Sequence, residues 1–306
     1  MGSVALPNPV MTASGTAGHG AELGRYLDLS ALGAVVVKSL SAEAWPGNPP
    51  ARVHEMPAGM LNSVGLQGPG VEAWLAQELP ALVASGARVV ASIWGRTVDG
   101  FERAASMLAG APPSVVAVEV NVSCPNVEDR SRMFAHSAAA TEDAVAATAG
   151  CGRPRWAKLS PNVTDLVEVA DAARRGGAEA LTLVNTVLGM AIDPETFEYR
   201  LGTGGGGVSG PAIHPIAVRA VHDVAVALPG VPIVGVGGVA TGEDAAELLL
   251  AGAVAVQVGT ATFADPRAPV RVLEGLRAWA ERHGVSSLRE VVGVVHGSRL
   301  RQGPRR

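Results

Sequence analysis

A short polar stretch, Asn121-Val122-Ser123-Cys124-Pro125-Asn126, follows the largely apolar run Val115–Val120 and carries several groups that could do chemistry. It places one thiol, one hydroxyl and two carboxamides in a turn fixed by proline. Buried strand ends rarely hold so much polarity without a ligand to receive it. A single cysteine among hydrogen-bonding neighbours suits positioned proton transfer or nucleophilic attack. The alternative interpretation is a half-buried structural cysteine in a capped turn.

The overall composition is that of a globular protein with a large core. The 306 residues are 48% hydrophobic, include 38 glycines and carry a net charge of −4. They can form one large α/β domain or two smaller ones, and they offer no basic field for nucleic acid or membrane. Two cysteines, Cys124 and Cys151, are too few for a disulfide framework. Zinc-type Cys/His spacing does not occur, so no metal is predicted.

The two ends of the sequence lead to two further expectations. No apolar run reaches 18 residues, and the N-terminus lacks a charged region followed by a hydrophobic core. A cytoplasmic protein without a membrane segment is therefore predicted. The arginine-rich end, residues 293–306, is expected to be a flexible basic tail.

Short apolar runs alternate with longer amphipathic stretches through the whole chain. Near-continuous apolar runs are typical of strands that are buried on both faces, as in parallel sheets. The predicted strands are Pro9–Ala13, Ala34–Val37, Arg88–Ile93, Val115–Val122, Trp156–Leu159, Ala180–Val184, Val231–Val236 and Ala253–Val258. The predicted helices are Ala21–Leu32, Val71–Ser85, Gly100–Leu108, Ser137–Thr148, Val163–Arg175, His214–Ala227, Gly242–Leu250 and Pro269–Arg282.

Eight strand–helix pairs predict an α/β protein with a single (β/α)8 TIM barrel over residues 1–306, since no linker is long enough to separate domains. A doubly wound sheet would need phosphate-binding glycines after its first strand, and Ser14-Gly15-Thr16-Ala17-Gly18 does not fit that pattern. In a barrel, chemistry is found where strands end. Almost every predicted strand end is polar or glycine: Ser14, Lys38-Ser39, Ser92, Asn121–Asn126, Lys158, Asn185-Thr186, Gly237-Gly238 and Gly259-Thr260.

Glycines after the seventh and eighth strands predict a phosphate site. Gly237-Gly238 and Gly259-Thr260 occupy the loops where barrels often bind phosphate on backbone N–H groups. Glycine allows close approach of the backbone to an anion, although tight turns are the alternative explanation. The run Gly204–Gly210 is expected to be a loop that brings further N–H groups to the same place.

Lys38 and Lys158 each end an apolar strand, and a buried lysine needs a partner. Glu119 shares the strand face of Asn121 and is the obvious candidate. One carboxylate is not expected to serve both lysines, so at least one should face an anionic ligand. A structural ion pair is the alternative for each.

Amides at four strand ends or loops could match the alternating donors and acceptors of a pyrimidine ring. They belong to Asn62, Asn121, Asn126 and Asn185, and Asn62 begins the loop Asn62-Ser63-Val64-Gly65-Leu66. Four histidines lie in loops or at helix starts and receive no role: His19, His54, His136 and His214.

In these motifs, the sequence from about Asn8 to Val292 resembles a soluble class 1 dihydroorotate dehydrogenase, most closely class 1B. The resemblance implies an FMN enzyme on a (β/α)8 barrel that oxidises dihydroorotate to orotate in pyrimidine synthesis. It implies that Cys124 is the general base for carbon 5 and that the hydride of carbon 6 passes to the flavin. Lys158 is expected to stabilise negative charge on the reduced ring. Class 2, which is membrane-associated, has serine in place of Cys124.

The resemblance also assigns binding residues. The implied FMN contacts are Ser14, Lys38, Ser39, Asn121, Lys158, Val184, Gly210, Gly237, Gly238, Gly259 and Thr260, with Ser92 where the family usually has a flavin-contacting asparagine. The implied substrate contacts are Lys38, Asn62, Ser63, Val64, Gly65, Leu66, Asn121, Asn126, Asn185 and Thr186.

The loop Asn185–Asp193 resembles class 1B more than class 1A, which uses fumarate. Class 1B implies NAD⁺ as final acceptor, reached through a separate subunit with FAD and a 2Fe–2S cluster, in a heterotetramer with a homodimeric core. This chain has neither the cysteines for a cluster nor a dinucleotide fingerprint. The alternatives are a class 1A enzyme, a related flavin enzyme acting on dihydropyrimidine or dihydrouridine, and a catalytically silent flavin-binding subunit.

Several features depart from the family pattern. Serine at position 92 reaches less far than asparagine, Trp94 replaces a small residue, and Gly68 stands where asparagine is common. The chain also begins near its first strand without the usual N-terminal hairpin, which predicts a less well covered barrel bottom. The segment Val127–His136 is expected to be either a mobile lid over the substrate or a solvated loop.

Overall fold

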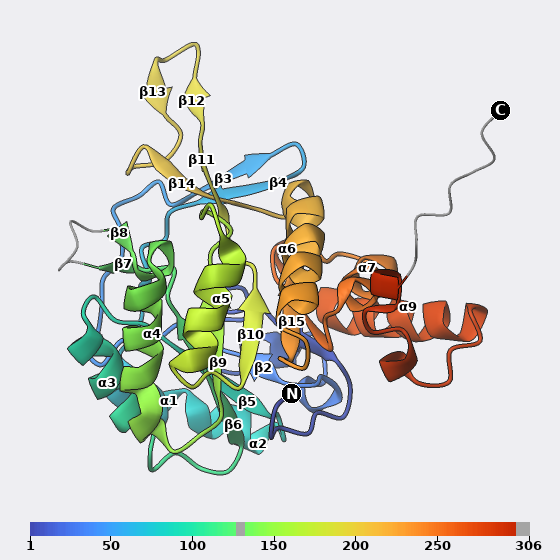
Figure 1. Cartoon of the computed structure of the whole chain (residues 1–306). Coiled ribbons are helices and arrows are strands. Elements are labelled where there is room, and N and C mark those ends of the chain that lie inside the picture. Colours follow the sequence, from blue (N-terminus) through green and yellow to red (C-terminus); the bar gives the residue numbers. More distant parts are fainter. Residues whose placement is uncertain (127–131, 298–306) are drawn as a thin grey trace.

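Eight short runs rich in valine, alanine and leucine form the parallel strands of one barrel (Figure 1). The structure is a computed structural model that describes residues 1–126 and 132–297. The strands are β1 (Val10–Thr12), β2 (Val35–Val36), β5 (Val89–Ile93), β6 (Val115–Asn121), β9 (Arg155–Leu159), β10 (Ala180–Leu183), β15 (Ile233–Val236) and β16 (Ala255–Val258). Their order is β1-β16-β15-β10-β9-β6-β5-β2, and a bridge between Met11 and Ala34 joins β1 to β2. The predicted (β/α)8 barrel and all eight predicted strands are confirmed.

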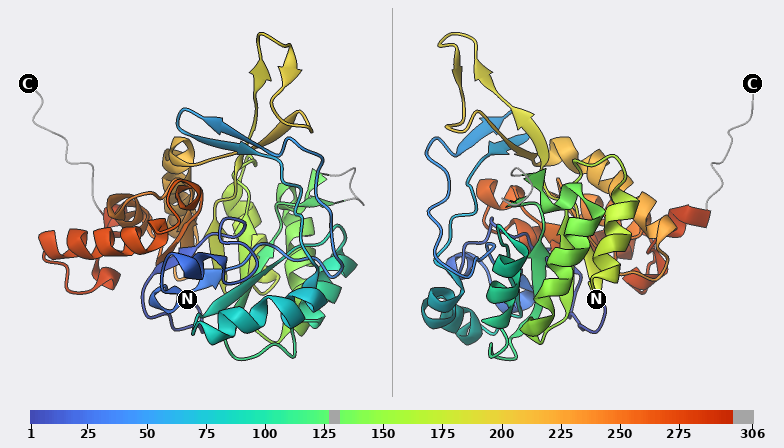
Figure 2. Two further views of the ribbon diagram at one scale, coloured as in Figure 1. Left: turned by 180° about the vertical axis from the view of Figure 1, so that it is seen from behind. Right: turned by 60° about the vertical axis from the view of Figure 1, so that its left-hand side comes forward.

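Helices surround the barrel (Figures 1 and 2). They are α1 (Val71–Gln77), α2 (Leu79–Ala84), α3 (Val98–Ser106), α4 (Ala138–Ala147), α5 (Leu166–Arg175), α6 (His214–Ala227), α7 (Gly242–Ala251), α8 (Ala261–Ala264) and α9 (Ala268–Arg282). No helix in the described ranges is both long and apolar enough to cross a membrane.

Two predicted helices differ from the structure. The helix expected over Ala21–Leu32 is wrong, because two 3-10 turns, Glu22–Arg25 and Leu29–Ala31, occupy this segment. The Asp28 carboxylate accepts hydrogen bonds from both the N–H and the hydroxyl of Ser30, which starts a new turn in competition with a continuous helix. The helix expected over Val71–Ser85 is divided at Glu78, since Pro80 favours the first turn of a new helix.

The lower barrel interior is one apolar layer to which each strand contributes one side chain. Strand residues alternate between the interior and the surrounding helices. The inward residues are Met11, Val36, Val90, Ala117, Trp156, Ala180, Val234 and Ala255. Val4 is buried against this layer, and Met1 and Leu6 pack beside it. The expectation of a poorly covered barrel bottom is therefore wrong, because Met1, Val4 and Leu6 cover this layer.

Two residues further along the strands, the interior becomes polar. Glu119, Thr182 and Gln257 are fully buried, and Lys158 is nearly so. Thr182 and Gln257 donate hydrogen bonds to Glu119 at 3.1 and 2.7 Å. Because Glu119 and Gln257 belong to β6 and β16, which are not neighbours in the sheet, this contact crosses the barrel interior.

A second, antiparallel sheet lies over the carboxyl ends of the barrel strands (Figure 1). It has the order β11-β14-β4-β3 and consists of β3 (Val53–Met56), β4 (Gly59–Asn62), β11 (Val187–Met190) and β14 (Gly205–Ser209). We call this sheet the roof. The hairpin of β12 (Ile192–Asp193) and β13 (Glu198–Tyr199) projects beyond it (Figure 2). Strands β7 (Pro125–Asn126) and β8 (Arg132–Met133) form a short pair.

The roof was not expected from the sequence. The glycine run was predicted to be a loop, but Gly205–Ser209 is strand β14, which pairs with both β11 and β4. A Cβ at Gly207 would overlap the Thr186 side chain, so glycine permits the close approach of β14 to the β10–β11 connection.

Two predictions concern segments that the structure describes only in part. Residues 127–131 of the expected lid lie outside the described residues, as do residues 298–306 of the expected tail. Within the described part, Phe134–His136 and Val294–Gly297 each form a 3-10 turn, and His296 Nε2 lies 2.8 Å from the carbonyl oxygen of Ala251.

The contact between α7 and α9 gives a test of the packing. A Cβ at Gly242 would overlap the backbone of Gly275 and Leu276, whereas a Cβ at Gly110 would meet no atom within 4 Å. Gly242→Ala should therefore lower the free energy of unfolding by about 1–3 kcal/mol, as overpacked sites do. Gly110→Ala should change it by less than about 0.5 kcal/mol. Denaturant unfolding would measure both, and equal stability of the two variants would contradict the packing.

Candidate active site

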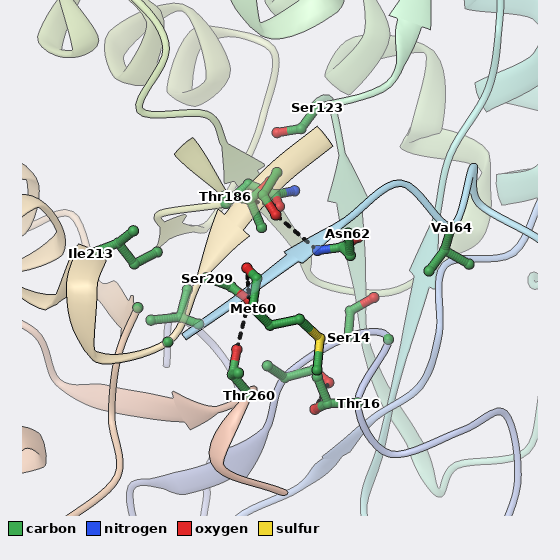
Figure 3. A pocket seen from close by; sticks show the side chains of 18 of the residues that line it. Ser14, Thr16, Met60, Asn62, Val64, Ser123, Thr186, Ser209, Ile213 and Thr260 are labelled. Atoms are coloured by element: carbon green, nitrogen blue, oxygen red, sulfur yellow. Dashed lines mark hydrogen bonds between the residues drawn. The ribbon is translucent and has the colours of Figure 1, made fainter. Parts of the chain in front are cut away.

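A cavity of about 390 Å³ opens between the carboxyl ends of the barrel strands and the roof. Its volume lies within the usual range of small-molecule sites. Figure 3 shows its walls: Ser14 and Thr16 follow β1, Met60 and Asn62 belong to β4, and Thr260 follows β16. The cavity therefore combines residues that are far apart in the sequence.

Most of the predicted site residues line this one cavity. The lining residues among them are Ser14, Lys38, Ser39, Asn62, Ser63, Val64, Gly65, Leu66, Asn121, Lys158, Val184, Asn185, Thr186, Gly210, Gly237, Gly238, Gly259 and Thr260. Ser92 and Cys124 do not line it. Asn126 lies on β7, but its side chain is outside the described part of the structure.

The cavity floor contains a buried ion pair. Lys158 Nζ lies 3.8 Å from Glu119 Oε1, and the Lys158 side chain is 6% exposed. Glu119 Oε2 accepts from Thr182 and Gln257, whereas Oε1 has no hydrogen bond within the described residues. The expected pairing of Glu119 with one lysine is confirmed, and that lysine is Lys158.

Lys38 has no such partner. Its ammonium group makes no hydrogen bond or ion pair with any residue that the structure describes, and Lys38 lines the cavity. Burial, together with the nearby Lys158 cation, lowers the pKa of Lys38 to about 8. The pKa of His19 is also lowered, by burial and then by the Lys38 charge. An unpaired cation at the wall of a cavity favours an anionic or electron-rich ligand.

A chain of hydroxyl groups supports the same wall. Ser39 Oγ lies 3.1 Å from Ser14 Oγ and 2.9 Å from Ser92 Oγ, and it accepts from Asn121 Nδ2 at 3.1 Å. Ser92 pairs in register with Glu119, one layer below the cavity. The structure therefore places Ser92 beneath Ser39, where it orients that hydroxyl without bordering the cavity itself.

Carboxamides define the side of the cavity toward the roof. Asn185 Nδ2 donates to Asn121 Oδ1 at 3.4 Å, and Asn62 Nδ2 donates to the carbonyl oxygen of Gly207 at 3.2 Å. The side chain of Asn162 donates to the carbonyl oxygen of Thr186 and accepts from the N–H of Leu188. Asn162 therefore holds the start of β11, where the chain leaves the barrel and enters the roof.

The opposite side presents backbone donors. Gly210, Gly237, Gly238, Gly259 and Thr260 line it, and Thr260 Oγ1 donates to Ser209 Oγ at 2.8 Å (Figure 3). The N–H groups of Gly238 and Thr260 meet no acceptor in the described part of the chain. Unsatisfied N–H groups beside glycines form the kind of concave surface that binds anions.

Cys124 is buried behind this wall rather than on it. Its thiol is fully buried and donates to the carbonyl oxygens of Gly95 and Asn121 at 3.1 and 3.3 Å. Burial raises the pKa of the Cys124 thiol to about 12. The geometry therefore holds a protonated thiol next to the cavity, and Ser123 of the same turn borders the cavity instead.

Sequence reasoning did not find several lining residues from the roof and the β7–β8 pair: Val53, Met60, Met133 and Leu188. Gly206, Gly207 and Ser209 also line the cavity, and they belong to the run that was expected to bring N–H groups to this place. The turn residues Pro57 and Ala58, followed by Gly59, are a hairpin signal that could have revealed β3 and β4. The glycine run of β14 offers no comparable signal.

The chain resembles known proteins over nearly its full length. A family model described as dihydroorotate dehydrogenase matches residues 2–279. The dihydroorotate dehydrogenase B (NAD(+)) catalytic subunit of Alkaliphilus oremlandii is 46% identical over 293 residues, which cover 95% of this chain and 96% of that protein. The same subunit of Desulforudis audaxviator is 47% identical over 292 residues, covering 95% and 94%.

A relative with another name is equally similar. The putative dihydroorotate dehydrogenase A (fumarate) of Solibacter usitatus is 47% identical over 293 residues, covering 95% of this chain and 96% of that protein. These matches confirm the resemblance inferred from the sequence motifs, and the chain belongs to the dihydroorotate dehydrogenase family.

Proposed function

We propose that this chain oxidises dihydroorotate to orotate in pyrimidine synthesis with FMN as its bound cofactor. The observation that carries the proposal is the composition of the cavity at the strand ends. Several carboxamides meet there with a lysine and backbone N–H groups that have no partner among the described residues. An anionic, planar pyrimidine and a phosphate-bearing flavin need this set of partners.

The residues present fit FMN. Gly210, Gly237, Gly238, Gly259 and Thr260 would hold its phosphate, because two of their N–H groups meet no acceptor in the described ranges. Ser14, Lys38, Ser39, Asn121, Lys158 and Val184 would hold the ring system. When bound, FMN supplies the acceptor for the hydride of carbon 6. The Lys158 ammonium, held by Glu119 at 3.8 Å, would stabilise the negative charge that arrives with that hydride.

Dihydroorotate would lie between the flavin region and the roof. Asn62, Asn121 and Asn185 would pair with its ring amides, and the loop residues Ser63–Leu66 with Thr186 would enclose it. Lys38, whose ammonium group has no partner among the residues that the structure describes, would meet the substrate's negative charge.

Cys124 would take the proton of carbon 5. A general base must be deprotonated to do so, and the buried thiol holds its proton at neutral pH. The proposal therefore requires the thiol to leave the carbonyl oxygens of Gly95 and Asn121 and turn toward the neighbouring cavity. The chain neighbours of Cys124 are Pro125 and Ser123, and Ser123 already borders the cavity.

NAD⁺ is the proposed final acceptor, reached through a separate subunit that carries FAD and a 2Fe–2S cluster. The names of two relatives contain both NAD(+) and "catalytic subunit", which supports a partner subunit. Within the described part of the chain, no three His, Cys, Asp or Glu residues gather as a metal-binding group. Fumarate is the second candidate, favoured by the name of the Solibacter relative.

An anaerobic absorbance experiment tests the reaction. Protein reconstituted with FMN should lose its flavin absorbance when dihydroorotate is added, because the hydride reduces the ring. Retained absorbance with tightly bound FMN would contradict the activity and support a catalytically silent flavin-binding protein. Re-oxidation by fumarate alone would favour class 1A, whereas re-oxidation by NAD⁺ only with the partner subunit would favour class 1B.

Replacement of the proposed base gives a second prediction. Cys124→Ser should slow flavin reduction about 10²–10⁴-fold at pH 7, the usual effect of losing a general base. Since the pKa of the thiol lies far above 7, the thiolate becomes about tenfold more abundant per pH unit, and the wild-type rate should rise with pH between 7 and 9. Stopped-flow absorbance measures both. The control is Cys151→Ser, at the other buried cysteine, and an unchanged rate in Cys124→Ser would exclude the role.

The free lysine gives a third prediction, on binding. Lys38→Met should weaken orotate binding about 10–100-fold at pH 7, since a hydrogen bond to a charged group is lost. Because the pKa of Lys38 is lowered to about 8, its charge is present below pH 8 and is lost above it. Orotate affinity of the wild type should therefore fall above pH 8, and that of Lys38→Met should not. Calorimetric titration with orotate would measure the affinity of both proteins at equal FMN content. The same dependence of affinity on pH in the wild type and in Lys38→Met would contradict the prediction.

A further inference from the structure

His214 lies at the start of α6, directly behind the turn Gly237-Gly238. No sequence motif assigns it a role. Its ring is largely buried, with the side chain 11% exposed. Nδ1 lies 2.8 Å from the carbonyl oxygen of Gly237. Nε2 lies 3.2 Å from Glu247 Oε2 and 4.0 Å from Asp244 Oδ1, both on α7.

Both ring nitrogens therefore face oxygen acceptors. A neutral imidazole has one N–H and one lone pair, so it can satisfy only one of the two contacts. Nδ1 makes the shorter contact, so we assign the N–H to Nδ1, where it donates to the Gly237 carbonyl oxygen. Asp244 is already fixed, because its Oδ2 accepts from the N–H groups of Ala240 and Thr241. The geometry thus fits a ring held between the α7 carboxylates and the Gly237 carbonyl group.

The hydrogen bond to Gly237 orients a whole peptide unit. In a trans peptide, the carbonyl oxygen of one residue and the N–H of the next point in opposite directions. The N–H of Gly238 therefore points away from the imidazole. His214 does not border the cavity, whereas Gly237 and Gly238 do. No acceptor among the described residues takes the Gly238 N–H.

Close packing against α6 also fixes the Gly237-Gly238 turn. Gly238 has φ +72°, and a Cβ there would lie 2.7 Å from His214 Cβ. Gly237 has φ +137°, and a Cβ there would lie 2.7 Å from Ala217 Cβ. Both positions require glycine because the backbone is left-handed and the first turn of α6 lies directly against it. Rotation of the Gly237–Gly238 peptide would break the hydrogen bond between His214 and the Gly237 carbonyl oxygen.

We propose that His214 is a positioning residue for phosphate recognition. By bridging the α7 carboxylates and the Gly237 carbonyl group, it aims the Gly238 N–H at the phosphate of the flavin. This inference rests on the proposed FMN cofactor. It assigns His214 an effect on the phosphate alone and none on the flavin ring.

Binding of FMN and of riboflavin, which lacks the phosphate, to the apoprotein tests the proposal. His214→Ala should weaken FMN binding about tenfold and leave riboflavin binding unchanged, since the hydrogen bond that orients the Gly238 N–H is lost. In His214→Asn, the side-chain amide can still donate to the Gly237 carbonyl group, so FMN affinity should recover part of the loss. Quenching of flavin fluorescence measures each dissociation constant. His222→Asn, an exposed histidine of the same helix, is the matched control.

The outcomes separate this proposal from the proposed function. If wild-type protein binds neither flavin, the FMN cofactor itself is wrong. If wild-type protein prefers FMN and both His214 variants keep the same ratio of FMN to riboflavin affinity, the role of His214 is wrong while the cofactor stands. Equal losses for FMN and riboflavin in His214→Ala would likewise overturn the role, because they indicate a general structural effect. His214→Asn keeps the test available if His214→Ala does not fold.

Discussion

The site depends on one buried carboxylate inside the barrel. Glu119 is fully buried, and its stability there requires the donors Thr182 and Gln257 and the cation Lys158. Removing any partner would leave a charge or polar group uncompensated at low dielectric. These four residues belong to β6, β10, β16 and β9, so the interaction also specifies which faces of these strands point inward. A one-residue slip would turn each side chain outward into the helix layer.

The same carboxylate determines the charge of the cavity. Glu119 forms an ion pair with Lys158 and has no contact with Lys38, so the Lys38 charge stays uncompensated within the described residues. Burial, and then the nearby Lys158 charge, lowers the pKa of Lys38, and an anionic ligand would reverse this effect. Hydroxyl and amide side chains surround this charge without neutralising it. Ser92 belongs to this support, because it lies in the Glu119 layer and reaches the cavity only through Ser39.

The barrel could be predicted because each parallel strand is a continuous apolar run with a polar or glycine residue at its end. The roof could not be predicted, because β14 is rich in glycine and lacks an apolar pattern. Its partner strand β4 is also distant in the sequence: Gly207 pairs with Asn62, which lies 145 residues earlier. Cys124 illustrates a different limit. Its motif identified a reactive residue, but only the folded turn shows that the thiol points to Gly95 and Asn121. Spacing along a chain does not specify which way a turn directs a side chain.

His214 shows why a residue with a proposed positioning role can lack any motif. Its partners are a backbone carbonyl group and carboxylates on another helix, so neither its neighbours in sequence nor its residue type indicates a role. The barrel separates the two tasks of the site for a physical reason. In the proposed arrangement, charge near the flavin ring comes from strand side chains, which the interior layers hold rigidly. Recognition of a phosphate needs backbone N–H groups, whose direction is set by peptide planes, and the first turn of α6 is the rigid element close enough to fix the plane at Gly237.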